Sequence, residues 1–468
     1  MASFVRPATR SLRTAANSQC RHYSAPVDGS LPAAKQRFVP TEGTYPKGFL
    51  LGSAHAGVKP SNTTREDVAI VASEELCTAV GFFTKNKFAA APVRLCKDVL
   101  SKANRTGGVR GVVINSDCAN AVTGTGGMED AIKMSSVTDE LFSSQGSDVI
   151  RTLVMSTGVI GQRLPIDKIL STIPKIKSKL GSSHDQWLGV AKAVMTTDTF
   201  PKLVTRQFTL PSDPSTTYTV AGFSKGAGMI HPNMATMLSV VCTDIKIDID
   251  SLTEAGQEAL RTSFNSISID GDTSTNDSLA IFANGAAATG SSKGITSTES
   301  PDFKAFEKAL RSVAIDLAKL VVRDGEGATK FVSIHVKGSD KATAAHVGRT
   351  IAVSPLVKTA LYGKDANWGR ILCAIGNVET DVFDPEKVSV SFGVPNTNGE
   401  GRLRLVEKGQ PILPVDEELA KVILEEEDVD VYVDLGDAAS SSTDEGGVII
   451  YTCDFSHEYI TINGDYRT

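Results

Sequence analysis

The residues with the clearest chemical potential lie in one segment near the middle of the chain, which reads KGAGMIHPNMATML. Gly226 and Gly228 permit backbone angles that other residues avoid, and Pro232 fixes its own φ angle. Such a segment can hold the peptide bond between Ala235 and Thr236 where the threonine hydroxyl reaches the preceding carbonyl. Attack there would give an ester, and hydrolysis would leave Thr236 as a new N-terminus. A threonine with a free α-amine combines a nucleophile and a base in one residue.

An ordinary Gly/Pro loop that enters a hydrophobic strand over 237–242 is the simpler interpretation, and composition alone favours it. In the chemical interpretation, Thr236 itself would supply both the nucleophile and the general base. A free α-amine has a reference pKa of about 7.7–8.0, close to the pH at which a general base works best. Thr236 would therefore need no separate catalytic histidine. His231, five residues upstream, could assist, but a structural role in the loop is the simpler interpretation.

Acyl transfer also needs donors for a tetrahedral oxyanion. Thr157 and Gly158 offer a hydroxyl and an unobstructed backbone N–H after a hydrophobic strand. The alternative is a helix-capping threonine followed by a turn glycine. We interpret Cys118 as a small core residue, because no histidine pattern supports a nucleophilic thiol. The seven cysteines and seven histidines show no metal-ligand spacing, so we expect reduced thiols and no metal.

Short hydrophobic runs predict the strands that position these residues. The runs 111–114 and 152–155 indicate buried strands that end in polar motifs. Alternating apolar and polar residues over 245–249, 332–336 and 429–433 predict half-exposed strands.

Two apolar stripes at three- and four-residue steps predict helices. The longer stripe runs from Phe303 to Leu320, starts at Ser300-Pro301 and ends before Gly325, which places Glu326 in the following loop. The shorter stripe covers 187–194 and leads into Thr196-Thr197. Helices and strands mixed in this way indicate an α/β or α+β fold.

Length and composition limit the possible partners. A chain of 468 residues suits two domains or one large two-layer body, and 41% hydrophobic with 22% charged residues is typical of a globular protein. The net charge of −6 and the lack of a basic stripe argue against nucleic acid, and no apolar run is long enough to span a membrane. We expect small molecules or further copies of the chain as partners.

The first 23 residues contain four arginines and no acid, with many small and hydroxyl residues. This composition predicts a mitochondrial transit peptide over 1–23, since a secretory signal would need a continuous apolar region. A basic tail without a targeting role is the alternative.

Several motifs together resemble the ornithine acetyltransferase family, bifunctional enzymes of arginine biosynthesis. They occur in the family's order and cover nearly everything after about residue 45. Besides the segment around Thr236, they are the motifs at 115–121, 155–161, 195–199, 270–277, 323–327, 363–370 and 462–466.

The resemblance implies a layered helix-sheet-sheet-helix core and self-cleavage between Ala235 and Thr236. Segments 24–235 and 236–468 would then form two chains entwined in one body. It also implies a dimer of cleaved heterodimers. The transit peptide and the reduced thiols together predict a location in the mitochondrial matrix.

The resemblance assigns roles to individual residues. Thr236 is the implied nucleophile, and Thr157 with Gly158 forms the oxyanion hole. The residues that contact substrate are Thr196, Thr197, Lys225, Thr236, Glu326, Asn463 and Thr468. Lys225 suits a carboxylate and Glu326 suits an ammonium group, although both would otherwise be read as solvated charges or a structural ion pair. Arg467 departs from the family pattern, and its charge would alter the rim of the pocket.

The implied reaction moves acetyl from N2-acetylornithine to glutamate in a ping-pong scheme through acetyl-Thr236. We expect no cofactor. Acetyl-CoA is a second implied donor, although no phosphate-binding loop is present. The nearest alternative is a self-cleaving aminopeptidase or amidase of the same fold, with water as acceptor. A non-enzymatic amino-acid-binding protein is the alternative from another class.

Overall fold

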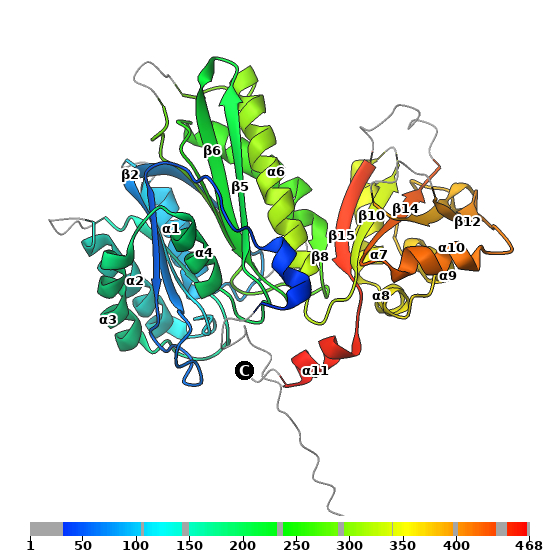
Figure 1. Ribbon diagram of the computed structural model, residues 1–468, viewed down its shortest axis with the longest axis horizontal. Coiled ribbons are helices and arrows are strands. Elements are labelled where there is room, and N and C mark those ends of the chain that lie inside the picture. The colour runs from blue at the N-terminus through cyan, green and yellow to red at the C-terminus, as the bar shows by residue number, and fades with distance from the viewer. Residues whose placement is uncertain are drawn as a thin grey trace, which may run out of the picture.

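The computed structural model describes residues 31–103, 107–142, 149–231, 237–288, 294–338, 340–395, 401–436 and 447–465. The predicted transit segment 1–23 lies outside these residues. The described residues form two lobes side by side (Figure 1). Each lobe combines a mixed sheet with helices, so the predicted α/β class is confirmed.

The larger lobe is built on a sheet with the strand order β4-β3-β2-β9-β7-β6-β5, in which β1 also pairs with β2. Its strands are β1 (Phe49–Ala54), β2 (Val68–Phe83), β3 (Val109–Asn115), β4 (Thr152–Ser156), β5 (Lys202–Leu210), β6 (Asp213–Lys225), β7 (Leu238–Thr243) and β9 (Ser278–Ala283). The long strand β2 joins two halves of this sheet. Residues 68–72 of β2 pair with β1 and β3, whereas residues 78–83 pair with β9.

The two halves of the sheet form facing layers with a core between them. In β7, Val240 and Cys242 pack into the core that contains the first half, whereas Val241 packs into a core with two helices on the other side. Successive strand residues point to opposite faces, so β7 separates these cores. The predicted helix-sheet-sheet-helix arrangement is confirmed.

Helices cover both outer sides of this sandwich (Figure 1). The first half of the sheet contacts α1 (Ala91–Ala103), α2 (Gly124–Glu140), α3 (Ile166–Ile176) and α4 (His184–Ala193). The second half contacts α5 (Ile249–Thr262) and α6 (Pro301–Arg323).

Strands from both sides of position 236 are interleaved. β7 and β9 follow this position in the sequence, yet both lie between β2 and β6, which precede it. Each of the two strands has partners on both sides, and its backbone groups are therefore hydrogen-bonded across the ladder. A break at position 236 would leave this pairing intact.

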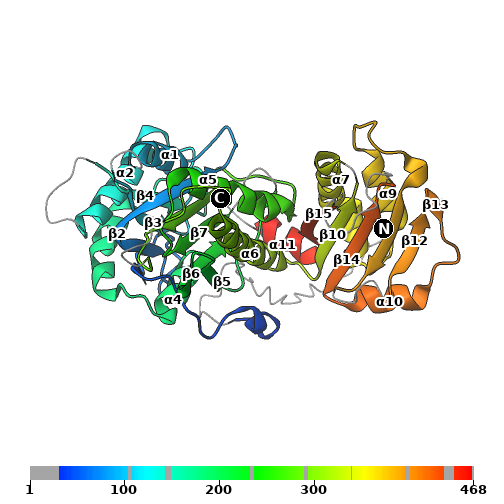
Figure 2. The same cartoon turned by 90° about the horizontal axis from the view of Figure 1, so that it is seen from above.

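The smaller lobe has a second sheet with the order β13-β12-β11-β14-β10-β15-β8. Its strands are β8 (Ile267–Ser268), β10 (Phe331–Lys337), β11 (Ser389–Gly393), β12 (Leu403–Glu407), β13 (Gln410–Pro411), β14 (Asp428–Asp434) and β15 (Gly447–Cys453). Its helices are α7 (Lys341–Val353), α8 (Pro355–Tyr362), α9 (Trp368–Gly376) and α10 (Glu417–Glu425). The C-terminal helix α11 (His457–Asp465) lies between the two lobes, as seen from above (Figure 2).

Most of the predicted elements are present. The strands at 111–114, 152–155, 332–336 and 429–433 are confirmed, and α6 begins at Pro301 with Ser300 as its cap. The strand predicted over 245–249 is wrong. β7 ends at Thr243, and Ile249 is the first residue of α5, where the Asp248 carboxylate accepts the Ser251 N–H (2.7 Å).

Two features are absent from the part of the chain that the structure describes. None of its helices combines the length and hydrophobicity needed to cross a membrane. It also contains no cluster of three or more His, Cys, Asp or Glu side chains arranged to hold a metal ion.

Candidate active site

One pocket collects every predicted site residue that the structure describes. It lies where the chain leaves β4 and β6 and meets the C-terminal helix α11. Its lining residues are Ala119, Thr157, Gly158, Ile160, Thr196, Thr197, Lys225, Gly228, Met229, Ser274, Asn276, Glu326 and Asn463. Ala235, Thr236 and Thr468 fall outside the described residues.

The turn after β4 requires a glycine. Gly158 has a φ angle of +128°, and a Cβ atom there would lie 2.2 Å from the carbonyl carbon of Asp117. A side chain would therefore be excluded both by its backbone angle and by contact. The Thr157 N–H donates to the carbonyl of Asn115 (3.1 Å), and the Val159 N–H donates to that of Asp117 (3.3 Å). The two predicted oxyanion donors thus occupy a rigid turn.

The Lys225 ammonium group lies at the centre of the buried side of the pocket, and its residue is only 3% exposed. Nζ donates to the Thr196 hydroxyl (2.8 Å) and to the Thr157 hydroxyl (3.3 Å). Burial lowers the pKa of Lys225, and the nearby Asp198 carboxylate opposes this effect only in part. Because a lysine only donates, both threonine hydroxyls accept here and keep their own protons for a ligand.

A buried network of ion pairs lies next to Lys225, on the side away from the pocket. The Lys202 ammonium contacts the Asp198 and Asp324 carboxylates, each at 2.6 Å, and all three side chains are at most 1% exposed. Asp198 also accepts the N–H groups of Gly226 (2.7 Å) and Thr196 (3.0 Å). Burial alone would raise the pKa of Asp198, but the charges of Lys202 and Lys225 hold it below its usual range. Buried charges persist when they are paired and hydrogen-bonded in this way.

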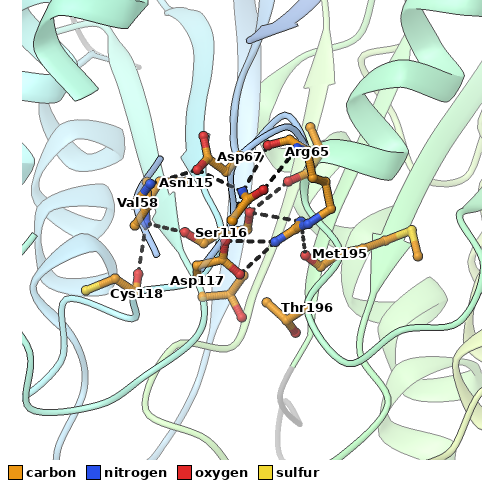
Figure 3. Close-up of polar contacts among 12 residues, drawn as sticks. Val58, Arg65, Asp67, Asn115, Ser116, Asp117, Cys118, Met195 and Thr196 are labelled. Atoms are coloured by element: carbon orange, nitrogen blue, oxygen red, sulfur yellow. Dashed lines mark hydrogen bonds and ion pairs between the residues drawn. The ribbon is translucent and has the colours of Figure 1, made fainter. Parts of the chain in front are cut away.

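A second ionic cluster joins two loops of the pocket, as Figure 3 shows. The Arg65 guanidinium donates to both oxygens of Asp117 (2.7 and 2.8 Å) and to the carbonyl of Met195 (2.8 Å). Arg65 thereby connects the loop beneath Gly158 to the residue before Thr196. Both bonds to Asp117 come from one guanidinium nitrogen, Nη2, and charge-assisted hydrogen bonds are stronger than those between neutral groups.

The opposite wall of the pocket carries the predicted ammonium partner. Glu326 follows α6, as the sequence indicates, and it is 8% exposed. Its N–H donates to the carbonyl of Ala227 (2.8 Å), and its Oε2 accepts from the Asn463 amide (2.9 Å). A Cβ atom on Gly228 would lie 2.5 Å from Oε2, so that glycine makes room for the carboxylate.

Several pocket residues were not identified from the sequence. Asn276 is one: its amide donates to the carbonyls of Ala119 (2.6 Å) and Ser156 (2.8 Å), which ties three motifs together. It lies in the motif at 270–277, which indicated the family but not the role of this residue.

The prediction for Cys118 was a core residue. Cys118 is buried and the pKa of its thiol is raised by burial, which agrees with a core role.

The layered fold thus places a buried lysine, Lys225, and a buried carboxylate, Glu326, in one small pocket. The ArgJ family profile matches residues 50–468. The chain is 55% identical over 476 residues to "Arginine biosynthesis bifunctional protein ArgJ, mitochondrial" of Ajellomyces capsulatus, covering 100% of this chain and 98% of the relative. It is 56% identical over 456 residues to the Aspergillus niger protein of the same name, covering 96% and 98%.

Among solved structures, the Bacillus halodurans arginine biosynthesis bifunctional protein argJ is 37% identical, with a TM-score of 0.42, and covers 48% of this chain and 98% of its own. The ornithine acetyltransferase from Mycobacterium tuberculosis, complexed with ornithine, is 32% identical, with a TM-score of 0.34, and covers 43% and 98%.

The chain belongs to the ArgJ family. The predicted assignment to an acetyltransferase of arginine biosynthesis that acts on small-molecule amino-acid substrates is confirmed, as is the mitochondrial location. The roles of individual residues, the matrix location and the oligomeric state remain predictions.

Proposed function

We propose that the enzyme transfers acetyl from N2-acetyl-L-ornithine to L-glutamate through an ester on Thr236. The observation that supports this most strongly is the meeting of the Thr157 hydroxyl, the Lys225 ammonium and the Glu326 carboxylate in one pocket. These groups come from segments far apart in the sequence. Their charges match a molecule that carries both a carboxylate and an ammonium group.

Maturation comes first in this scheme. The Thr236 hydroxyl attacks the carbonyl carbon of Ala235, its proton passes to the Thr236 nitrogen, and the C–N bond breaks to give an ester. Water then hydrolyses the ester, which leaves a carboxylate on Ala235 and frees the hydroxyl and the α-amine of Thr236. The interleaving of β7 and β9 between β2 and β6 would hold the two resulting chains together.

Acetyl transfer uses the new amine as the base. The Thr236 hydroxyl attacks the acetyl carbonyl while its proton moves to the α-amine. The α-ammonium returns that proton to the leaving nitrogen, so ornithine departs and an acetyl ester remains. The α-amine of glutamate attacks this ester, and the same steps in reverse order restore the hydroxyl and release N-acetylglutamate.

The pocket supplies groups suited to each part of the reaction. The Thr157 hydroxyl and the Gly158 N–H would donate to the oxyanion, and loss of one such donor typically costs about 2.7–4 kcal/mol. Lys225, with Thr196 and Thr197, would bind the carboxylate end of the substrate. Glu326, Asn463 and Thr468 would bind the ammonium end.

The wider setting follows from the same proposal. Cleaved chains 24–235 and 236–468 form the working unit, two such units form a dimer, and the enzyme resides in the mitochondrial matrix after removal of 1–23. It needs no cofactor, and acetyl-CoA serves as a second acetyl donor for glutamate.

The test is to incubate the purified enzyme with N2-acetylornithine and glutamate and to identify the products. We expect ornithine and N-acetylglutamate in equal amounts. Release of free acetate without N-acetylglutamate would instead show a hydrolase, and the absence of any turnover would show a binding protein.

A further inference from the structure

The pocket has an apolar wall to which the proposed function assigns no role. Among the described lining residues, only Ala119, Ile160 and Met229 carry apolar side chains. The other lining side chains end in hydroxyl, amide, ammonium or carboxylate groups. An apolar surface within a polar pocket suits an apolar part of the ligand. The reacting end of the donor has one such part, which is the methyl group of its acetyl.

Ala119 and Ile160 form one packed surface. Ala119 is 2% exposed and belongs to a hydrophobic cluster with Ala90, Val93 and Ala121. Ile160 is half-buried and packs against this cluster. Val93 belongs to α1, so a helix supports the surface. Close packing of this kind resists changes in volume, and the wall therefore has a fixed shape.

One turn joins this wall to the proposed oxyanion donors. Thr157 and Gly158 are followed by Val159 and Ile160, so the donors and part of the wall share one short segment. The Val159 carbonyl accepts the Ala119 N–H (2.9 Å), which fixes Ala119 beside the same segment. The apolar wall therefore adjoins the place where the acyl oxygen would bind.

The size of an acetyl group limits where its methyl group lies. The methyl carbon and the carbonyl oxygen are bonded to the same carbon atom and lie about 2.4 Å apart. An oxygen that accepts from Thr157 and Gly158 therefore holds the methyl group next to the segment that carries Ile160. Met229 belongs to the opposite wall, where it follows the glycine that makes room for the Glu326 carboxylate.

We propose that Ile160 determines the acyl specificity of the enzyme: with Ala119 it forms the subsite for the acetyl methyl group and excludes longer aliphatic acyl groups. This assignment rests on the proposed function, in which Thr157 and Gly158 bind the acyl oxygen. A propionyl group has one more methylene than acetyl, and that methylene would meet the packed wall. One extra methylene in a hydrophobic pocket changes kcat/KM by about 10–200-fold. Wild-type enzyme should therefore prefer acetyl to propionyl by at least about tenfold.

Shortening Ile160 should open this subsite. Ile160→Ala removes three carbon atoms from the wall, which is more than the extra methylene of propionyl needs. The transfer itself does not change. The amide C–N bond of N2-propionylornithine breaks, its acyl group forms the same enzyme ester, and the proton passes to the departing ornithine nitrogen. The amine of glutamate then takes the propionyl group, which gives N-propionylglutamate, and no further reactant is needed.

The experiment compares N2-acetylornithine with N2-propionylornithine as donors to glutamate and measures kcat/KM for each. Ile132→Ala is the matched control, because Ile132 lies on α2, is 38% exposed and is not among the described lining residues. We expect the propionyl-to-acetyl ratio to rise by about tenfold or more in Ile160→Ala. In Ile132→Ala it should stay at the wild-type value. A general loss of stability would slow both donors alike and cancel in this ratio.

Two results with the variants would overturn the inference and leave the proposed function intact. One is an unchanged ratio in Ile160→Ala. The other is a ratio that rises in Met229→Ala but not in Ile160→Ala, because the methyl group would then bind at the opposite wall. A wild-type enzyme that transfers neither acyl group would instead refute the proposed function itself.

A milder variant and the wild type cover the case in which Ile160→Ala does not fold. Ile160→Val removes a single carbon atom from the wall, and we expect it to raise the propionyl-to-acetyl ratio by about threefold or more. A ratio equal to that of wild type would overturn the inference. Equal use of the two donors by wild-type enzyme would also overturn it, because the wall would then exclude nothing.

Discussion

Replacing Thr157 with valine removes one hydroxyl from the pocket and leaves a side chain of nearly the same shape. In the folded chain that hydroxyl accepts from the Lys225 ammonium at 3.3 Å, and Lys225 keeps its shorter contact with Thr196 at 2.8 Å. We therefore expect a modest loss of stability, about 1 kcal/mol. The loss in catalysis should be larger, because the oxyanion would lose a donor worth about 2.7–4 kcal/mol, or about 10²–10³-fold in kcat.

The assay measures kcat for acetyl transfer per mole of cleaved enzyme, together with thermal unfolding. Thr152→Val is the matched control, since Thr152 begins β4, the strand that leads to Thr157, and its buried hydroxyl donates to Asp139 (2.6 Å), away from the pocket. We expect both variants to lose similar stability and only Thr157→Val to lose kcat. A Thr157→Val enzyme that retained kcat within about threefold of wild type would refute the assigned role, because a lost oxyanion donor costs far more.

Three further predictions follow from the same pocket and its flanks. Gly158→Ala should abolish acetyl transfer and lower the melting temperature, because a Cβ would lie 2.2 Å from the Asp117 carbonyl carbon at a φ of +128°; near-normal melting and kcat would contradict this. Glu326→Gln should raise KM for N2-acetylornithine by about 10- to 100-fold, the cost of a lost charged hydrogen bond, and an unchanged KM would exclude its contact with the ammonium group. Burial raises the pKa of Asp270 from 3.8 to about 6. The folded state therefore binds this proton more tightly than the unfolded state. As the pH rises from about 4 to 6, the free energy of unfolding of wild type should fall by up to about 3 kcal/mol relative to that of Asp270→Asn. Parallel stability curves from pH-dependent denaturation would contradict it.

Local signals in the sequence predicted several of the regular elements, and motif resemblance predicted part of the pocket lining. Helix α6 followed from an apolar stripe with Ser300-Pro301 at its start, and the structure caps it with the Ser300 hydroxyl, which accepts from Phe303 (3.1 Å). Motif resemblance selected residues such as Thr157 and Glu326, which lie 169 positions apart in sequence and line one pocket.

Long-range contacts were beyond the reach of sequence patterns. The Lys202–Asp324 pair joins residues 122 positions apart, and neither position carries a periodic signal. At 245–249, where a strand was wrongly predicted, two local sequence signals disagree. Alternating isoleucines indicated a strand, but Asp248 three positions before Ser251 is also a helix-capping pattern, and tertiary packing of α5 selected the helix. The separate smaller lobe was likewise not predicted.

The central claim is that Thr236, as a new N-terminus, carries the acetyl group. The most direct measurement is the denaturing mass spectrum of purified enzyme after incubation with N2-acetylornithine in the absence of glutamate. The chain averages 49.5 kDa over 468 residues, so fragments 24–235 and 236–468 should appear at about 22 and 25 kDa. Only the larger fragment should carry one added acetyl group, on Thr236, and glutamate should remove it. An active enzyme with an unbroken chain, or with acetyl on another residue, would contradict the account.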